Sequence, residues 1–215
     1  MNVLSIKVFF KLRIMILLLL FCSNETKAQD ELWTIVGVRK TSKKVDWLLL
    51  NMNFFHPDGS WFQNNTRFVL DFKSKTNFKF GVGYQQEFVK FPERTRVEYR
   101  PMLFLYYKKQ FGFFDLQDMS TMEFRFIDSN LMNRYRNEMA LHYTKFTGFS
   151  PFVSTEFFVN LDQLNYAGQR TVLGIDFPIQ NWKLNVFSFY ETNKDNQGLY
   201  SDKVVVGSAL VYQFK

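Results

Sequence analysis

Two-residue alternation of apolar and charged side chains runs through most of this chain and is clearest in residues 122–143. Phe124 and Phe126 alternate there with Glu123 and Arg125. Successive side chains of a β-strand point to opposite faces, so the pattern predicts strands with one apolar and one charged face. A chain built from such strands can bury or solvate either face, but it cannot fold as a helical bundle.

The same alternation, interrupted by turn residues, predicts about eleven strands and no helix in the mature chain. The expected strands are residues 31–40, 46–55, 65–73, 77–88, 95–107, 111–127, 131–143, 151–161, 170–177, 182–191 and 203–214. Strands at such short spacing indicate an all-β, antiparallel up-and-down barrel. We expect 10–12 strands, and an even number, because bacterial single-chain membrane barrels use even numbers.

The N-terminus reads as an export signal. Three basic residues precede an apolar run at residues 14–22, and Thr26-Lys27-Ala28 closes the segment with small residues at its ends. The run is too short for a membrane-spanning helix, which needs about 20 residues. We therefore predict a cleaved signal peptide at residues 1–28 and a single barrel domain at residues 29–215. Cleavage also removes Cys22, the one cysteine, so disulfides cannot stabilise the exported chain.

Composition narrows the classes of partner. The formal net charge is +7, of which +3 lies in the predicted signal peptide. The remaining charge is too small to indicate a nucleic-acid partner, and we predict none. Aromatic residues make up 19% of the chain, and such rings suit sheets and lipid–water boundaries.

Alternation alone does not decide which face lies inside, because a soluble barrel and a membrane barrel place the apolar face on opposite sides. The longer expected strands match the roughly 9–11 residues that a tilted spanning strand needs. Aromatic residues cluster near the segment ends, as in interfacial girdles. The ending Tyr212-Gln213-Phe214 resembles the terminal aromatic that outer-membrane barrels present to their assembly machinery, although Lys215 departs from it. We therefore predict a transmembrane barrel in the outer membrane of a Gram-negative bacterium, with outer-membrane lipid and this machinery as partners.

In such a barrel the charged face lines the lumen. The predicted lumen charge network comprises Arg67, Glu98, Arg100, Glu123, Arg125, Arg134, Arg136, Glu138, Glu156, Arg170 and Asp176. Arginine pairs with carboxylates through two parallel hydrogen bonds, and an unpaired charge in a partly desolvated lumen is costly. The pattern favours a narrow, ion-paired interior, with a structural envelope role or passage of very small solutes.

Several of these residues also carry a family resemblance. The motifs are Glu123-x-Arg125, Asn133-Arg134-Tyr135-Arg136-x-Glu138, Pro151-Phe152 with Glu156-x-Phe158, and Gln169-Arg170 with Gly174. In them the chain resembles the exported bacterial family filed as domain of unknown function 2490. The resemblance covers nearly all of the mature chain. It implies an outer-membrane β-barrel and no settled activity, and it supplies no catalytic residue.

Two other functions remain as alternatives. An outer-membrane lipid hydrolase, of phospholipase or lipid-A deacylase type, needs a serine nucleophile and a histidine base within hydrogen-bond reach. His142 shares its predicted face with Glu138, and Ser150 lies in the next link, but the local motif of outer-membrane phospholipases is missing. A soluble periplasmic barrel that binds an apolar ligand is the other alternative, and there the charges would be solvated.

The remaining chemistry is sparse. Two distant histidines and a cysteine-free mature chain disfavour a zinc site. The acidic residues of the charged face have arginines nearby, and a nearby cation lowers a carboxyl pKa, so they are poor general acids. We predict no catalytic residue, no metal and no cofactor, and the sequence leans against an enzyme.

Overall fold

The computed structural model describes residues 30–194 and 199–214, so the predicted signal peptide lies outside the described residues. The described chain forms β-strands and turns and contains no helix. In these two ranges, accordingly, no helix has the length and apolar character needed to cross a membrane. The all-β prediction is confirmed.

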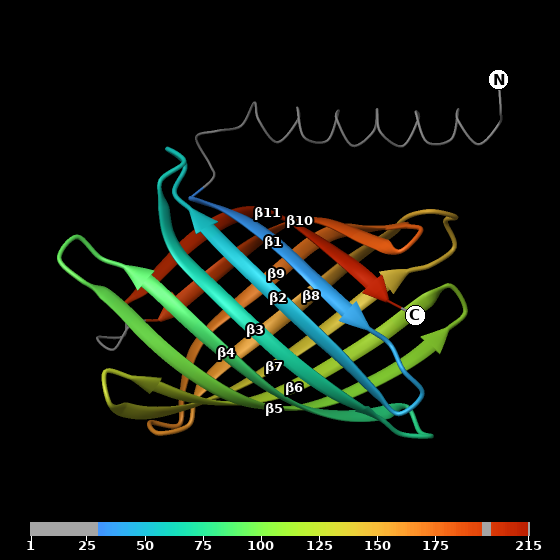
Figure 1. Ribbon diagram of the computed structural model, residues 1–215, viewed down its shortest axis with the longest axis horizontal. Coiled ribbons are helices and arrows are strands. Elements are labelled where there is room, and N and C mark those ends of the chain that lie inside the picture. Colours follow the sequence, from blue (N-terminus) through green and yellow to red (C-terminus); the bar gives the residue numbers. More distant parts are fainter. Residues whose placement is uncertain (1–29, 195–198, 215) are drawn as a thin grey trace.

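Eleven strands follow one another along the chain and are joined by turns of two to six residues. They are β1 (Glu31–Lys40), β2 (Val45–Phe55), β3 (Trp61–Lys73), β4 (Phe78–Lys90), β5 (Thr95–Phe111), β6 (Phe114–Ile127), β7 (Asn130–Tyr143), β8 (Ser150–Asn160), β9 (Asn165–Ile179), β10 (Trp182–Lys194) and β11 (Tyr200–Phe214). Consecutive strands pair antiparallel throughout, and the sheet closes on itself as a barrel of strongly tilted strands (Figure 1).

Closure occurs between the first and last strands. β1 pairs with β11 in parallel, from Glu31 opposite Val205 to Lys40 opposite Phe214. The predicted range of 10–12 strands is confirmed, but the expected even number is wrong. With eleven strands in an up-and-down order, the first and last run in the same direction, so the chain enters β1 at one end of the barrel and leaves β11 at the other (Figure 1).

Strand boundaries differ from the expected ones where polar residues belong to strands. β3 begins at Trp61, four residues earlier than predicted, because Asn64 and its neighbours pair across to β2 and β4. β5 continues to Phe111 and turns at Gly112, whose φ of 56° suits glycine. The tight turn between β6 and β7 lies at Asp128 and Ser129, as the sequence predicts, and both have positive φ.

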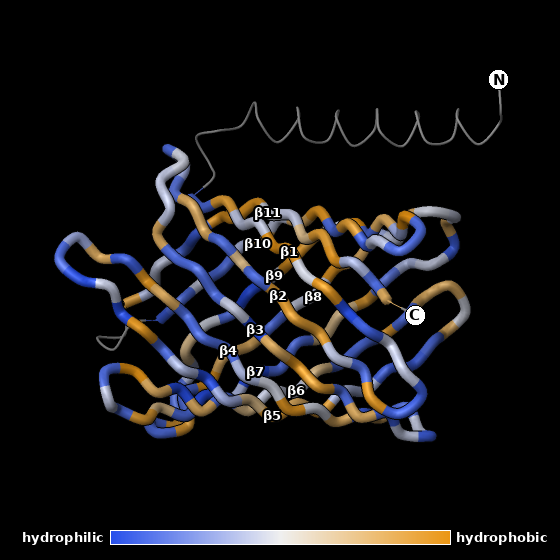
Figure 2. The backbone as a smooth tube through the Cα atoms, in the orientation of Figure 1, coloured by the Kyte–Doolittle hydropathy of each residue, from blue (hydrophilic) through white to orange (hydrophobic). Residues whose placement is uncertain are grey.

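The charged face of the strands lies inside the barrel and the apolar face outside. Phe80, Leu103 and Leu173 are 56%, 50% and 63% exposed, whereas Glu98 and Glu123 have no exposed surface. Hydropathy alternates along each strand accordingly (Figure 2). The barrel is therefore inverted relative to a soluble protein, whose apolar face would form the core.

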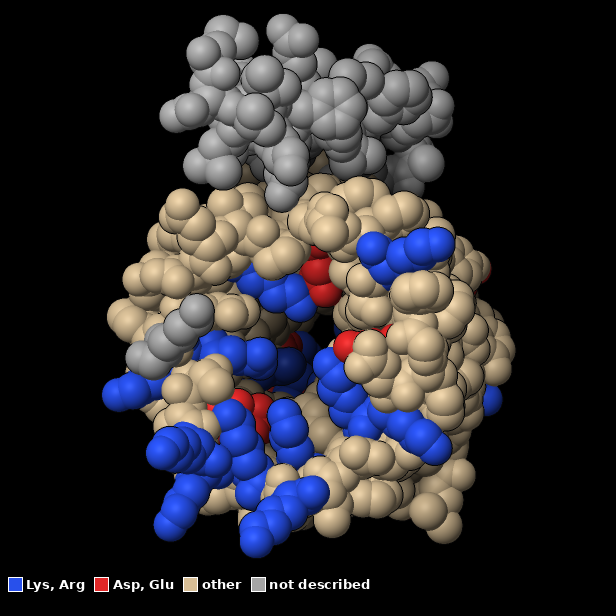
Figure 3. All heavy atoms as spheres, turned by 90° about the vertical axis from the view of Figure 1, so that its right-hand side faces the viewer, with Lys and Arg blue, Asp and Glu red and all other residues tan. Residues whose placement is uncertain are grey.

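Each end of the barrel is a ring of turns around the lumen. The C-terminal mouth is formed by residues 41–44, 74–77, 112–113, 144–149 and 180–181, beside the end of β11. The N-terminal mouth is formed by residues 56–60, 91–94, 128–129 and 161–164 together with the link between β10 and β11. Figure 3 looks into the hollowed C-terminal mouth, with Lys and Arg side chains around it.

Candidate functional site: an ion-paired belt in the lumen

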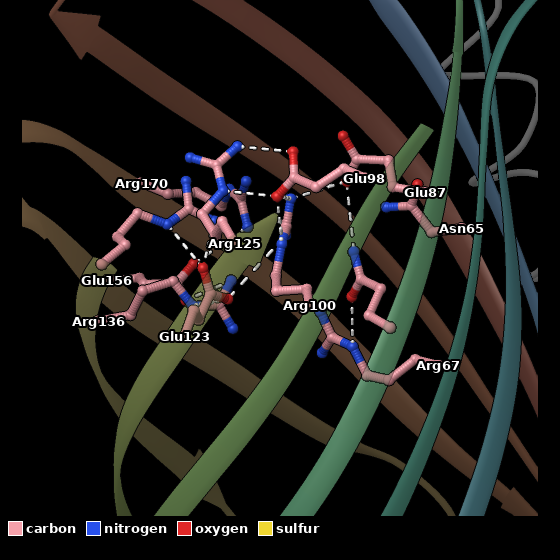
Figure 4. Close-up of polar contacts among 12 residues, drawn as sticks. Asn65, Arg67, Glu87, Glu98, Arg100, Glu123, Arg125, Arg136, Glu156 and Arg170 are labelled. Carbon is pink, nitrogen blue, oxygen red and sulfur yellow. Dashed lines mark hydrogen bonds and ion pairs between the residues drawn. The ribbon is translucent and has the colours of Figure 1, made fainter. Parts of the chain in front are cut away.

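A continuous chain of polar contacts runs around the lumen and links ten of the eleven strands. We call it the belt (Figure 4). Its members are Glu31, Arg67, Gln85, Glu87, Glu98, Arg100, Glu123, Arg125, Arg134, Arg136, Glu156, Arg170, Glu191 and Lys203.

The belt begins on β3 and reaches β5 through amide and carboxylate groups. Arg67 Nε donates to Gln85 Oε1 at 2.7 Å. Gln85 Nε2 in turn donates to Glu87 Oε2 at 3.3 Å, and Arg100 Nη2 donates to the same oxygen at 2.9 Å. Gln85, Glu87 and Arg100 are all buried, so these contacts compensate for lost hydration.

Glu98 is the next junction. Arg125 approaches it with two nitrogens, Nε at 2.6 Å from Oε1 and Nη2 at 2.9 Å from Oε2. Arg100 Nη2 lies 2.6 Å from the same Oε1. The paired donation from Arg125 is the bidentate geometry that arginine, unlike lysine, can provide.

Glu123, like Glu98, is a belt carboxylate with no exposed surface. Arg134 Nη2 lies 2.6 Å from its Oε2, and Arg136 Nε lies 3.1 Å from its Oε1. Arg100 Nη1 is 4.0 Å away on the other side. Glu123 has no exposed surface, so these three guanidinium groups balance its charge without help from solvent.

Arg170 carries the belt from β8 to β10. It contacts Glu156 at 3.0 Å and Glu191 through both Nε, at 2.6 Å, and Nη2. Its guanidinium also lies over the rings of Phe189 at 4.7 Å and Trp33 at 5.2 Å. The cation is thus held between carboxylates and aromatic faces, both of which attract it.

Lys203 closes the belt across the parallel seam between β11 and β1. Its Nζ lies 3.0 Å from Glu31 Oε1 and 3.4 Å from Glu191 Oε1. β2 is the strand outside the belt, and its inward residues at this level are the buried Met52 and Phe54.

Nine of the eleven residues of the predicted network lie in the belt, and Glu138 and Asp176 do not. Asp176 lies nearer the C-terminal mouth, where Lys183 Nζ is at 2.9 Å and Asn185 donates to it at 2.7 Å. Glu138 lines the cavity there beside His142. Because the strands are tilted, residues at similar positions along different strands lie at different heights along the barrel axis.

The N-terminal side of the lumen holds a cavity, and the C-terminal side holds a cavity at the mouth and a further one of about 240 Å³ against β1, β2, β10 and β11. The N-terminal cavity shares no lining residue with the other two. The belt lines the N-terminal cavity of about 220 Å³, and Asp71 and Tyr106 line the C-terminal one of about 300 Å³. Val69, Met102 and Phe104 form a buried apolar cluster between the two groups along β3 and β5. On this side of the lumen, packed apolar side chains therefore separate the two polar groups.

The histidine considered as a catalytic base lies in the C-terminal cavity. His142 Nδ1 is 3.4 Å from Asp176 Oδ2, and its ring stacks on Phe152 at 5.0 Å. The Ser150 hydroxyl instead donates to the carbonyl of Tyr143 at 2.9 Å. The two do not form a nucleophile–base pair. Within the residues that the structure describes, no group of three or more His, Cys, Asp or Glu is placed to hold a metal ion.

Five belt residues lie beyond the predicted network. Gln85, Glu87 and Glu191 follow the alternation of their strands, whereas Lys203 and Glu31 join the belt through the seam, which local alternation does not reveal. A second polar group lies on the outer wall, where Asn137 Nδ2 contacts both carboxylate oxygens of Asp118 at 3.2 Å. Ser120 and Tyr135 are hydrogen-bonded beside them at 2.9 Å. Asn137 interrupts the apolar side of its strand between Tyr135 and Met139, and that interruption was the available signal.

Apolar walls, an ion-paired interior and closure without a free sheet edge define a class of inverted β-barrels. Residues 30–201 match the family described as Protein of unknown function (DUF2490), and the chain belongs to that family. The resemblance inferred from the charged motifs is thereby confirmed. No curated protein matches the chain.

Proposed function

We propose that this protein is an integral outer-membrane β-barrel whose belt holds the lumen narrow. Its role is structural, in the envelope, or is the passage of very small solutes. The observation that carries the proposal is the apolar outer wall around a charged interior.

The outer wall exposes more apolar surface than water tolerates well. Large apolar side chains that are more than one third exposed occur on all eleven strands, for example Val36, Phe80, Leu103 and Leu173. Soluble monomers rarely expose contiguous apolar patches beyond a few hundred Å². Lipid tails solvate such a wall, and barrel closure leaves no unpaired backbone edge in the hydrocarbon.

The interior favours a narrow passage over a wide channel. The belt and the Val69, Met102 and Phe104 cluster lie between a cavity of about 220 Å³ on the N-terminal side and cavities of about 300 and 240 Å³ on the C-terminal side. Water and small ions fit such cavities, whereas a sugar crossing the belt would have to separate buried ion pairs, which is costly.

Export and assembly complete the proposal. Residues 1–28 act as the cleaved signal, and β11 is the strand presented to the barrel assembly machinery. The aromatic end of β11 supports this, because Tyr212 packs against Phe214 at 4.7 Å and Trp182 at 4.8 Å on the outer wall. Outer-membrane lipid is the direct partner.

Cell fractionation combined with gel electrophoresis of boiled and unboiled samples tests the proposal. A closed transmembrane barrel stays in the outer-membrane fraction and migrates faster before boiling. Recovery in the soluble periplasmic fraction without a heat-dependent shift would contradict the proposal and would favour the soluble ligand-binding barrel.

A further inference from the structure

The two mouths of the barrel carry opposite charge. The five turns of the C-terminal mouth contain Lys43, Lys44, Lys75 and Lys145 and no acidic residue. The four fully described turns of the N-terminal mouth contain a different set. Their charged residues are Asp58, Glu93, Arg94, Asp128 and Asp162. One mouth is therefore a ring of cations and the other is mainly acidic.

The turn lysines of the C-terminal mouth are available to an external partner. All four are exposed, and none forms an ion pair within the described residues. Lys73, at the end of β3, is by contrast paired with Asp46 at 2.8 Å. Unpaired cations on one rim create a local positive potential, which attracts anions within about 8–10 Å at physiological ionic strength.

Aromatic side chains lie at the same end of the barrel as these lysines. Trp47 is opposite Lys40 in the β1–β2 register. Further round the rim, Phe78 packs on Tyr107 at 5.0 Å. Lys145 Nζ lies 5.0 Å from the centroid of the Phe113 ring. Aromatic rings next to lysines are typical of the lipid–water interface, where rings sit at headgroup depth and amines reach toward phosphates.

We propose that the C-terminal mouth binds the anionic, phosphate-bearing headgroups of the lipid leaflet that surrounds it. The lysine ring recruits these lipids to the adjacent wall, and the acidic N-terminal mouth does not. The inference rests on the proposed membrane-spanning barrel and adds to it a lipid preference that differs between the two ends.

Tryptophan quenching by brominated lipids reads the two ends separately. The W61F/W182F variant reports from Trp47 at the C-terminal mouth, and W47F/W182F reports from Trp61 at the N-terminal mouth. Both variants keep Trp33, whose ring lies in the lumen beside Arg170. Each is reconstituted into vesicles of phosphatidylcholine and phosphatidylglycerol in which one or the other lipid carries bromine.

We expect brominated phosphatidylglycerol to quench Trp47 roughly threefold more strongly than its bulk fraction predicts, and to show no such excess at Trp61. The excess disappears at about 1 M salt, where the screening length falls to about 3 Å. It also disappears in a variant with Lys43, Lys44, Lys75 and Lys145 changed to Gln. A K90Q/K194Q variant, altered at the other end, keeps it.

Equal quenching of Trp47 and Trp61 by the two brominated lipids would overturn the lipid preference while leaving the barrel in the membrane. Failure of either brominated lipid to quench Trp47 and Trp61 would instead overturn the membrane proposal itself. Because the four lysines lie in exposed turns, their replacement leaves the strand ladder intact, and the heat-dependent gel shift verifies folding.

Discussion

Glu123 shows how a buried charge can be tolerated in the lumen. The carboxylate has no exposed surface and contacts Arg134 and Arg136 within 3.1 Å. The net stabilisation by such a group is small, since desolvation offsets most of the Coulomb attraction. Removing only one partner is different, because the remaining charges then stay buried without compensation.

Glu123→Leu is therefore expected to lower the free energy of unfolding by about 3–5 kcal/mol. The loss comes mainly from Arg134, which is left without a carboxylate partner, whereas Arg136 keeps Glu156 at 3.3 Å. Urea titration of the folded barrel in micelles, followed by the heat-dependent gel shift, measures it. Glu93→Leu, in a turn of the N-terminal mouth, is the control and should change stability by no more than about 0.5 kcal/mol. Equal losses in the two variants would contradict a stabilising role of the belt.

The polar pair on the outer wall makes a second residue-scale prediction. Asn137→Leu removes the amide that donates to Asp118 and leaves a carboxylate on an apolar wall, which should cost about 1–3 kcal/mol. The double variant D118L/N137L removes both groups and should be neutral or stabilising. The same urea titration compares them. A double variant less stable than the single one would show that the pair contacts something other than lipid.

Residue types were predictable from the sequence, whereas their partners were not. Alternation alone places Arg67, Glu98 and Glu156 on the inward face, because side-chain direction depends only on the two-residue period. Which carboxylate meets which arginine depends on strand tilt and stagger. These set the heights of facing residues and are not encoded locally. For that reason the alternation predicts Asp176 in one network with the belt residues, although Asp176 lies nearer the C-terminal mouth.

At the scale of elements, the seam between β1 and β11 decides the strand number. Parallel pairing is slightly less stable per residue than antiparallel pairing, so side-chain contacts across the seam matter more there. Lys203 supplies one such contact by joining Glu31 on β1 to Glu191 on β10. The alternation in the sequence predicts each strand. Whether the number of strands is odd or even, however, depends on which two strands pair to close the barrel, and no local sequence pattern encodes that pairing.

Lys203→Glu is expected to impair the pairing of β1 with β11, which closes the barrel, more than it impairs the pairing of the other strands. The new carboxylate would face Glu31 and Glu191, and like charges at this distance in a desolvated site repel strongly. The fraction of fast-migrating, unboiled protein after refolding should fall severalfold relative to wild type. Lys90→Glu, at the exposed end of β4, makes the same charge change away from the seam and should refold as wild type does. Equal refolding of both variants would exclude a role of Lys203 in closure.

For the whole molecule, the belt and the apolar cluster beside it separate the N-terminal cavity from the cavities on the C-terminal side. The belt contains nearly equal numbers of positive and negative side chains, so it has little net charge with which to select cations over anions. A solute that crosses the belt must instead separate its ion pairs, which is costly. In the proposed membrane setting, the wild-type barrel should conduct weakly in planar bilayers. Widening the lumen requires removing a pair without leaving other charges unpartnered.

The pair Glu156 and Arg170 meets that requirement. After E156A/R170A, Arg136 keeps Glu123 at 3.1 Å and Glu191 keeps Lys203 at 3.4 Å, so each former partner of the pair retains a counter-charge. Loss of both long side chains widens the lumen beside β8 and β9. Single-channel conductance should therefore rise severalfold, while the heat-dependent gel shift persists.

The isosteric E156Q/R170M variant is the control, because it removes the same charges but retains the side-chain length. It should stay near the wild-type conductance if the belt obstructs by its bulk, and approach that of E156A/R170A if it obstructs by its ion pairs. A folded E156A/R170A barrel with unchanged conductance would place the obstruction elsewhere, at the Val69, Met102 and Phe104 cluster.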